Sequence, residues 1–338
     1  MADPVILTVL LNYRTPHMTI RAARAALVAM EGLTGELVIV DNDSRDGSFE
    51  TIQAAIETEL TGSETPVRLI AAPHNGGFGA GNNVGIRAGL AAGGKPDFVY
   101  ILNSDAFPER DAIRRLLDHL RAHPEVGFAG SYLHGPDGDD HVSCFRFPGI
   151  LSEIESAARF GPVSRLLRRF TVPLPVPDAT RRVDWLAGAS MLARQSVLDQ
   201  IGLFDETFFL YFEETDLSLR AMRAGYETHY VRDSVVTHIG GESTGMKVWK
   251  RVPQYWLDSR WHYYSKNHGR AYAALATLAH VGAGLFWRLR RLVQRKPQID
   301  PDHFLRDLVL HDARALFRAL PTPQVARTPS PLQAETKS

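Results

Sequence analysis

Cysteine is almost absent from this chain, in which Cys144 is the only one. A single cysteine can form neither an internal disulfide nor a cysteine-rich zinc site, so the sequence predicts a protein of a reducing compartment. Nothing around Cys144 resembles a nucleophile site. The first residues also lack the basic start and long apolar core of a signal peptide, and the apolar run at 5–11 has the length of a buried strand. We therefore expect a cytoplasmic protein.

Net charge is absent as well, because 38 lysines and arginines balance 38 aspartates and glutamates. Binding to nucleic acid needs a basic surface that neutralises phosphates, so this balance argues against a nucleic-acid partner. The phosphate-loop pattern GxxxxGK[ST] is missing. The pattern GxGxxG, counted from Gly77, also fails, because Asn82 stands at its last place. These absences argue against the common phosphate-loop and NAD-binding classes.

The segment 1–135 instead shows a regular alternation of short apolar runs and helical patterns. The apolar runs are rich in aliphatic and β-branched residues and span 5–11, 37–40, 67–71, 98–102 and 126–130. The helical patterns span roughly 18–30, 48–59, 81–91 and 112–123. Such alternation predicts an α/β fold with a mostly parallel sheet flanked by helices, in which ligands bind at the carboxyl ends of the strands.

Three of the predicted strands end in polar side chains. Asn, Asp and Ser also favour turns and helix caps, and Asp43 or Ser44 could simply cap the next helix. Because the ends of parallel strands meet at one edge of a sheet, we favour a joint binding site over three separate turns. Its candidate residues are Asn12, Tyr13, Asp41, Asn42, Ser44, Asn103, Ser104 and Asp105.

A glycine-rich segment, NGGFGAGNN at 75–83, lies between the third predicted strand and the next helix. Glycines let a ligand approach the backbone closely, and a helix N-terminus favours phosphate. A tight strand-to-helix turn is the simpler alternative. The candidate ligand contacts in this segment are Asn75, Gly77, Phe78, Gly79 and Asn82.

Residues 146–182 differ in character from the rest, with several prolines and a basic amphipathic run at 165–170. A solvated loop, a lid and a membrane-facing segment all fit this composition.

The run 183–192 follows, where the small residues Gly188 and Ala189 beside Trp185 suit a wall for a flat ligand. A buried strand is equally natural there.

Three carboxylates in four residues, Glu213, Glu214 and Asp216, follow an aromatic run at 208–212. Acids at the start of a helix are favourable by themselves, which is the alternative to a catalytic role. On a helix that begins here, Glu213 and Asp216 face one way and Glu214 another. This helix, predicted for 216–224, is followed by a strand that leads to His238, which is either structural or a ligand.

In their order along the chain, these blocks resemble the family 2 glycosyltransferases, specifically the rhamnosyltransferase-like branch with a GT-A fold. The resemblance covers about residues 5 to 268. Its blocks are LLNY at 10–13, DNDSRDGS at 41–48, NGGFGAGNN at 75–83, LNSDA at 102–106, the segment 185–226 and HIGG at 238–241. No single block would carry the resemblance.

The resemblance implies a binding site for a nucleotide diphosphate sugar. The end of the first strand and Asp41 would hold the base and ribose, and the segment 75–83 would also contact the diphosphate. Asp105 matches the second acid of the DxD metal motif, and His238 a late histidine that completes the metal sphere, so the implied cofactor is Mg²⁺ or Mn²⁺. Asn103 replaces the first acid of the motif, which removes one negative charge.

The resemblance also implies an inverting transfer. Glu214 matches the family's aspartate base, which deprotonates the acceptor hydroxyl. Because Glu214 is one methylene longer than aspartate, Glu213 and Asp216 remain alternatives. Arg220 belongs to the same motif, in which an ion pair between helix and loop is expected. Trp185, Gly188 and Ala189 would line the sugar and acceptor pocket.

The implied donor is dTDP-rhamnose, with a UDP-sugar as the alternative. The implied acceptor is a saccharide or a polyprenyl-diphosphate-linked saccharide, as in bacterial surface polysaccharide synthesis. A non-catalytic binder of nucleotide or glycan is a rival hypothesis. A sugar nucleotidyltransferase is less favoured, because it needs a basic glycine-rich loop near the N-terminus, where this chain has LLNYRTPH.

Helical patterns continue beyond the matching blocks. Residues 254–268 form an aromatic and basic helix, and in 271–287 His280 is the only residue of a type that can carry charge near neutral pH. Such a length is at the lower limit for a membrane span, and basic residues follow, so we favour a helix on an anionic membrane surface over a spanning one. A packed helical subdomain is the alternative. The cytoplasmic face of the inner membrane is the expected location.

The predicted domain organisation follows from these patterns. A glycosyltransferase domain covers 1–250, with a nucleotide-sugar half at 1–135 and an acceptor and catalytic half at 136–250. A helical extension covers 251–320 and a disordered tail 321–338.

Overall fold

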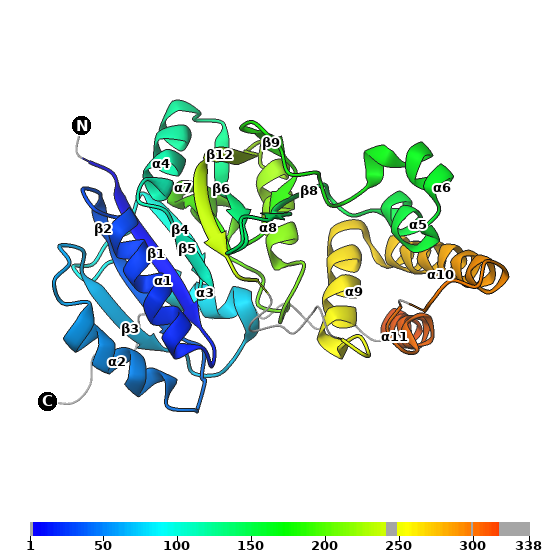
Figure 1. Cartoon of the computed structure of the whole chain (residues 1–338), viewed down its shortest axis with the longest axis horizontal. Helices are drawn as coiled ribbons and strands as arrows, with labels where there is room; N and C mark the ends of the chain where they lie inside the picture. Colours follow the sequence, from blue (N-terminus) through cyan, green and yellow to red (C-terminus); the bar gives the residue numbers. More distant parts are fainter. Residues whose placement is uncertain (1–2, 241–248, 299, 318–338) are drawn as a thin grey trace, which may run out of the picture.

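A computed structural model describes residues 3–240, 249–298 and 300–317 of the chain. The predicted tail at 321–338 and Gly241 of the HIGG block lie outside the described residues. Figure 1 shows a large twisted sheet with helices on both faces, and a group of helices beside it that contains α5, α6, α9, α10 and α11.

The central sheet is mixed: β1 to β4 run parallel, and the pairs beyond β4 are antiparallel except for β6 with β12, which is parallel. Its strand order is β3-β2-β1-β4-β11-β6-β12-β5, with β7 beside β6 and β9 beside β12. The four parallel strands are β1 (Val5–Asn12), β2 (Thr34–Asp41), β3 (Val67–Ala71) and β4 (Phe98–Asn103). The others are β5 (Ala106–Pro108), β6 (Val126–His134), β7 (Asp140–His141), β9 (Arg181–Val183), β11 (Ser190–Arg194) and β12 (Glu227–His238). A separate pair joins β8 (Cys144–Phe145) to β10 (Trp185–Leu186).

Alternating side chains of the central strands build a hydrophobic core on each face of the sheet. In β1, Ile6 and Leu10 face one core, while Leu7 and Val9 face the other. The first core packs against α1 (Pro16–Ala29), α2 (Ser48–Glu59) and α4 (Ala112–Ala122). The second packs against α3 (Gly77–Ala88), α7 (Gln195–Ile201) and α8 (Glu213–Arg223). The predicted parallel sheet with helices on both faces is confirmed for the segment 1–135.

Two helices begin earlier in the chain than the sequence predicted. The helix expected at 81–91 begins at Gly77, so the glycine-rich segment forms its first turn. The helix expected at 216–224 begins at Glu213. In both places the starting turn packs against another segment of the chain, which local sequence patterns do not report.

The region 146–182 holds two helices and a short 3-10 turn: α5 (Ile150–Ala158), α6 (Gly161–Leu166) and η1 (Arg168–Phe170). A simple solvated loop was therefore the wrong alternative. Helix α5 packs against α10 (Arg270–Val293), which also contacts α9 (Gln254–His268) and α11 (Phe304–Phe317). Among the described residues, no helix has both the length and the apolar character needed to cross a bilayer.

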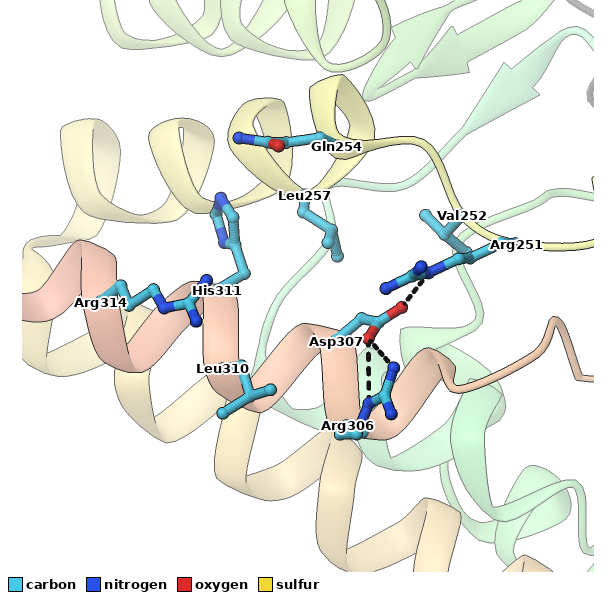
Figure 2. Close-up of a pocket in the computed structure, with 9 residues that line it drawn as sticks. All are labelled: Arg251, Val252, Gln254, Leu257, Arg306, Asp307, Leu310, His311 and Arg314. Carbon is cyan, nitrogen blue, oxygen red and sulfur yellow. Dashed lines mark hydrogen bonds and ion pairs between the residues drawn. The ribbon is translucent and has the colours of Figure 1, made fainter.

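Ion pairs of exposed arginines with the mostly buried Asp307 line a cavity of about 520 Å³ between the segment that leads into α9 and helix α11 (Figure 2). The Asp307 carboxylate accepts hydrogen bonds from Arg251 and Arg306 there. The residues that line this cavity belong to the C-terminal helical group and not to the strand ends, so it is distinct from the candidate site described next.

Candidate functional site

The ends of β1 and β2 are joined by a buried network of polar side chains. The Asp41 carboxylate accepts hydrogen bonds from the Asn12 amide at 2.7 Å and from the Ser44 hydroxyl at 2.6 Å. The hydroxyl of Thr19 donates to the Asn12 side-chain oxygen at 2.7 Å. Because Asn12, Asp41 and Ser44 are all nearly inaccessible to solvent, they shape the strand ends rather than forming an open surface.

Side chains around this network are more accessible. Tyr13, Asn75, Phe78 and Asn103 are each partly exposed at the carboxyl edge of the parallel strands or beside it. The Asn42 amide bridges the second strand to the glycine-rich segment, donating to the Asn75 side chain at 3.0 Å and to the Gly77 carbonyl at 3.1 Å. The structure therefore brings the predicted polar strand ends and the segment 75–83 together.

Near this edge, two buried amide oxygens, Oδ1 of Asn42 and Oδ1 of Asn82, have no hydrogen-bond partner among the described residues; the third such amide oxygen, Oε1 of Gln195, belongs to α7. An unpaired buried polar atom is costly in a folded protein and is concentrated at functional sites. Both atoms belong to the segments that the sequence assigned to nucleotide binding.

Close packing explains why the segment 75–83 needs glycine. Gly77 has a φ of +87°, and a Cβ there would lie 1.7 Å from the Phe209 carbonyl oxygen. The amide of Phe78 donates to this same oxygen at 3.0 Å. A Cβ on Gly79 would lie 2.9 Å from the Cβ of Phe204. The glycines therefore serve contact with the segment before α8, and they set the position of the Phe78 ring.

Asp105 and His238 come together through strand pairing. Strand β5 follows Asp105 directly and pairs with β12, which places Ala106 opposite His238. The His238 Nε2 lies 3.3 Å from Oδ1 of Asp105, and the Gly240 amide donates to Oδ2 at 3.1 Å. Burial tends to raise the pKa of Asp105, but the interactions with His238 and Gly240 outweigh it and lower the pKa, so the carboxyl is ionised at neutral pH.

Asp105 and His238 can hold a divalent cation only if the substrate supplies the remaining ligands. Among the described residues, no group of three or more His, Cys, Asp and Glu side chains is arranged to hold a metal. The two side chains offer one ionised carboxylate oxygen and one imidazole nitrogen. Hard cations commonly take their remaining ligands from phosphate oxygens and water, so this donor set suits a cation bound together with a diphosphate.

The two neighbouring glutamates of α8 differ in access to solvent. Glu213 is 1% exposed, and its Oε2 has no hydrogen-bond partner among the described residues. Glu214 is partly exposed, and its Oε1 accepts a hydrogen bond from the Gly188 amide at 3.1 Å. Burial raises the pKa of both carboxyls, and for Glu213 the nearby Glu214 raises it further. Glu214 is the more accessible of the two.

Asp216, the third acid, is fully buried and engaged in ion pairs. Its carboxylate accepts hydrogen bonds from Arg220 at 2.9 Å, Lys266 at 2.8 Å and Asn267 at 2.9 Å. Arg220 also donates to the backbone carbonyls of residues 201, 202 and 203. The sequence predicted an ion pair between helix and loop, but Arg220 and Asp216 pair within α8. Arg220 reaches the loop only through its hydrogen bonds to these backbone carbonyls, which position α8.

The segment between β10 and β11 links the two halves of the candidate site. The amide of Asn103 donates to the carbonyl of Ala189 at 3.1 Å, while the adjacent Gly188 amide donates to Glu214. A Cβ on Gly188 would lie 2.7 Å from the ring of Phe78 and 2.8 Å from Oε1 of Glu214. The end of β4 and the candidate base therefore lie on either side of one short turn.

Trp185 occupies a different setting from the predicted ligand wall. Its ring stacks on Phe145 with centroids 4.1 Å apart, and its Nε1 donates to the Arg146 carbonyl at 2.9 Å. The indole thus anchors β10 to the segment after β8. Its edge remains partly exposed.

Sequence reasoning did not identify several supporting side chains. Lys266 donates to both Asp205 and Asp216 at 2.8 Å, and His262 lies 2.8 Å from the same Asp205 carboxylate. Ser104 accepts a hydrogen bond from the Thr15 hydroxyl at 3.1 Å. The i, i+4 spacing of His262 and Lys266 puts both on one face of α9 and was the one available signal.

The fold is that of the GT-A glycosyltransferases. The structure resembles a mannosyltransferase from Pyrobaculum calidifontis in complex with GDP-mannose and Mn²⁺, with a TM-score of 0.51 and 14% identity over 94% of this chain and 88% of that one. It also resembles the Staphylococcus aureus protein TarS in complex with UDP-GlcNAc, with a TM-score of 0.53 and 12% identity over 92% and 81% of the two chains.

The family model described as glycosyltransferase like family 2 matches residues 12–263, so the chain belongs to glycosyltransferase family 2. An N-acetylglucosaminyl-diphospho-decaprenol L-rhamnosyltransferase of Mycobacterium tuberculosis is 31% identical over 245 residues, which cover 68% of this chain and 74% of that protein. The rhamnosyltransferase WbbL of Escherichia coli is 28% identical over 160 residues, which cover 46% and 58%. The chain is thus similar to the rhamnosyltransferase-like branch, as the sequence blocks predicted.

Proposed function

We propose that the protein transfers a rhamnosyl group from dTDP-rhamnose to a polyprenyl-diphosphate-linked saccharide, with inversion at the anomeric carbon. The observation that carries this proposal is the turn at Gly188 and Ala189, which contacts the end of β4 on one side and Glu214 on the other. A donor diphosphate near Asp105 and an acceptor hydroxyl near Glu214 would then meet across this turn. The relative from Mycobacterium tuberculosis supports both the sugar and the lipid-linked acceptor.

In this reaction Glu214 is the base. Its carboxylate accepts the proton of the acceptor hydroxyl while that oxygen forms a bond to the anomeric carbon and the bond to the diphosphate breaks. A raised pKa makes Glu214 a better proton acceptor near neutral pH. Glu213 is too buried to reach an acceptor, and Asp216 is held by Arg220 and Lys266.

The donor binds at the carboxyl ends of β1, β2 and β4. Tyr13, Asn75 and Phe78 contact the base and ribose, and Asn12, Asp41 and Ser44 hold that edge in shape from beneath. Asn42 and Asn82, whose unpaired amide oxygens are buried, support this edge from within the protein. A UDP-sugar is the alternative donor.

Asp105 and His238 would hold Mg²⁺ or Mn²⁺ beside the donor diphosphate. A bound cation neutralises the charge that develops on the leaving diphosphate. The Gly240 amide and the His238 ring keep the Asp105 carboxylate ionised and oriented for this role.

We place the reaction on the cytoplasmic side of a membrane. The chain has a single cysteine and so no internal disulfide, which suits a reducing compartment. This cysteine is fully buried, and burial raises the pKa of its thiol to about 11, so it is an unreactive structural residue. A peripheral location also brings the enzyme to an acceptor that stays in the bilayer. In this arrangement a glycosyltransferase domain over 1–250, with a donor half and an acceptor half, carries a helical extension over 251–320.

A donor panel with the purified protein tests the transfer. dTDP-rhamnose, UDP-sugars and GDP-sugars are incubated with a synthetic polyprenyl-diphosphate N-acetylglucosamine acceptor, and nucleotide release and product are measured with Mn²⁺ and with chelator. We expect release only with dTDP-rhamnose and the acceptor together. Glu214→Gln should lower kcat by about 100-fold or more with little change in donor affinity. Glu213→Gln is the matched control and should retain most activity.

Two outcomes would contradict the proposal. Nucleotide-sugar binding without release for any acceptor would favour a non-catalytic binding protein. Full turnover in Glu214→Gln would assign the base to another residue. For the cation site, dTDP should raise the Tm more with Mn²⁺ than with chelator, and Asp105→Ala should remove this difference; an unchanged difference would exclude Asp105.

A further inference from the structure

Helix α10 presents a solvent-exposed face made only of apolar residues. The well-exposed positions from 271 to 293 are Ala271, Leu275, Leu278, Gly282, Leu285, Phe286, Leu289, Leu292 and Val293. The large side chains among them range in exposure from 44% for Phe286 to 77% for Val293. At 3.6 residues per turn these positions fall on one side of the helix, in a stripe about 27 Å long from Leu275 to Val293. We call this surface the α10 stripe.

The opposite side of α10 already has its partners. Ala273, Ala276 and Thr277 are buried, and Gly284 packs against the Leu305 side chain of α11. The α10 stripe therefore points away from the helical group, and nothing within the described part of the chain covers it. Soluble proteins rarely expose a continuous apolar surface of this kind unless it binds something.

The part of the chain that carries the α10 stripe is basic. Residues 270–298 contain six arginines and lysines and no acid, although the whole chain has no net charge. Arg288, Arg290 and Arg291 lie within the last turns of the helix, and the exposed Arg295 and Lys296 follow it. Basic residues beside an apolar helix face are the pattern of helices that lie in the interface of an anionic bilayer.

Residues 159–177, which follow α5 and contain α6 and η1, extend the α10 stripe. We call them the α6 segment. The ring of Phe160, at the start of α6, has its centroid 5.7 Å from that of Phe286 in the α10 stripe. The guanidinium carbon of Arg290 lies 4.5 Å from the centroid of the same Phe160 ring. Residues 159–177 contain four arginines and no acid, and of these arginines Arg159 pairs with Asp300 at 2.9 Å. Leu166 and Phe170 are exposed among them. Figure 1 shows α5, α6 and α10 together at the end of the molecule away from β3.

We propose that the α10 stripe, with the adjoining α6 segment, is the surface by which this protein lies on an anionic phospholipid bilayer. The leucines and Phe286 enter the headgroup and acyl-chain boundary, and the arginines bind lipid phosphates. A second copy of the chain fits less well, because a two-fold contact pairs the same surface with itself, and residues 270–298 offer no acid to the arginines of the other copy. This docking surface goes beyond the transfer reaction and does not depend on it.

Vesicle binding by the full-length protein tests the proposal without any donor or acceptor. The protein is floated with vesicles that mix phosphatidylcholine with phosphatidylglycerol as the minor, anionic component, and with vesicles of phosphatidylcholine alone. We expect binding to the anionic vesicles that weakens in high salt, because each basic residue near the surface contributes about five-fold at low salt. The double substitution Leu278→Glu with Leu289→Glu should weaken binding by about ten-fold or more, because it places two charges in the apolar boundary.

Val28→Glu is the matched control, because Val28 is an exposed apolar residue of α1. Figure 1 shows α1 on the other side of the molecule from α10. It should bind as the wild type does, and circular dichroism should show all variants folded. A cysteine-reactive environment-sensitive dye gives a second readout, since the native Cys144 is buried. The dye at Leu289→Cys should shift to the blue on anionic vesicles, and at Val28→Cys it should not.

Three results would overturn the proposal. The wild-type protein could stay unbound on both kinds of vesicle, or the double glutamate variant could bind as well as the wild type. A wild-type dimer in solution that this variant converts to monomer, without vesicle binding by either, would show that a second copy covers the α10 stripe.

Discussion

Glu213 and Glu214 are neighbours on α8, but the chain places their carboxyl groups in different surroundings. Glu213 points into the protein with one oxygen unpaired among the described residues, whereas Glu214 lies at the Gly188 amide and remains partly exposed. Burial of a carboxyl without a cation disfavours its charged form. The buried Glu213 therefore stays protonated over a wider pH range than an exposed glutamate, and Glu214 is free to exchange a proton with a substrate.

Replacing Glu213 by glutamine should stabilise the protein at neutral and alkaline pH. The folded-state pKa of Glu213 is raised well above 4.5, so the folded protein holds this proton after the unfolded chain has lost it. The wild type then loses stability as pH rises from about 4.5 toward the folded pKa. Glu213→Gln has no such loss, and its Tm should exceed that of the wild type by at least about 2 °C at pH 8, with a smaller difference at pH 5.

Thermal unfolding at the two pH values, followed by circular dichroism, measures this effect. Thr51→Ala, on the exposed face of α2, should leave the pH dependence unchanged. A Tm difference that grows toward pH 5 would show that Glu213 is ionised in the folded protein.

At the scale of elements, local patterns in the sequence were sufficient for most strands and helices. Helix α2 and strand β3 have the predicted ends, because their apolar spacing and turn residues are local signals. The pairing of β5 with β12 has no local signal, because β5 is very short and its partner comes much later in the chain. The family resemblance named Asp105 and His238 as partners, but strand register is what brings them together.

The start of α3 also depends on a distant segment of the chain that local sequence patterns cannot identify. Glycine spacing predicted a close approach to the backbone, but the partner is the protein's own Phe209 carbonyl, from a segment far along the chain. The burial of Asn12, Asp41 and Ser44 was likewise not predictable, since it depends on Thr19 and the packing of α1 over the strand ends. Patterns along the chain identified the residues of the candidate site but not which of them face solvent.

The contact between α3 and the segment before α8 should not tolerate a side chain at residue 77. Gly77→Ala would place a Cβ against the Phe209 carbonyl at a φ that alanine rarely adopts. We expect a loss of about 2 kcal/mol or more in the free energy of unfolding and weaker donor binding. Gly62→Ala is the control, because a Cβ there meets no atom within 4 Å. Urea unfolding and nucleotide titration measure both quantities, and equal stability of the two variants would contradict the packing argument.

At the scale of the whole molecule, a buried ionic network joins the 146–182 region to the C-terminal helices. Glu153 of α5 lies 3.1 Å from Arg260 of α9 and 2.6 Å from His280 of α10. Arg260 also lies 3.1 Å from Asp312 of α11. Four helices that are far apart in sequence thus share one charge network, and the two regions form a single packed group.

Loss of the Glu153 charge should therefore loosen this whole group. Burial alone would raise the pKa of Glu153, but Arg260, His280 and Tyr264 outweigh it and lower the pKa to about 2. A lowered carboxyl pKa stabilises the fold above about pH 4.5, and this contribution is lost as pH falls toward 2. Glu153→Gln leaves the Arg260 charge in a buried site with less compensation, so we expect a loss of about 3 kcal/mol at pH 7 that shrinks between pH 5 and pH 3.

Asp307→Asn is the matched control for this prediction, because the arginines that bind Asp307 at the cavity of Figure 2 are exposed. Exposed ion pairs contribute little to stability, since water and salt screen them and their side chains lose conformational freedom. Urea unfolding at pH 7, 5 and 3 should show a large, pH-dependent difference for Glu153→Gln and almost none for Asp307→Asn. Similar losses in both variants would mean that the Glu153 network does not hold the four helices together.

Because α10 carries the proposed membrane surface, Glu153→Gln should also weaken vesicle binding, whereas Asp307→Asn should not.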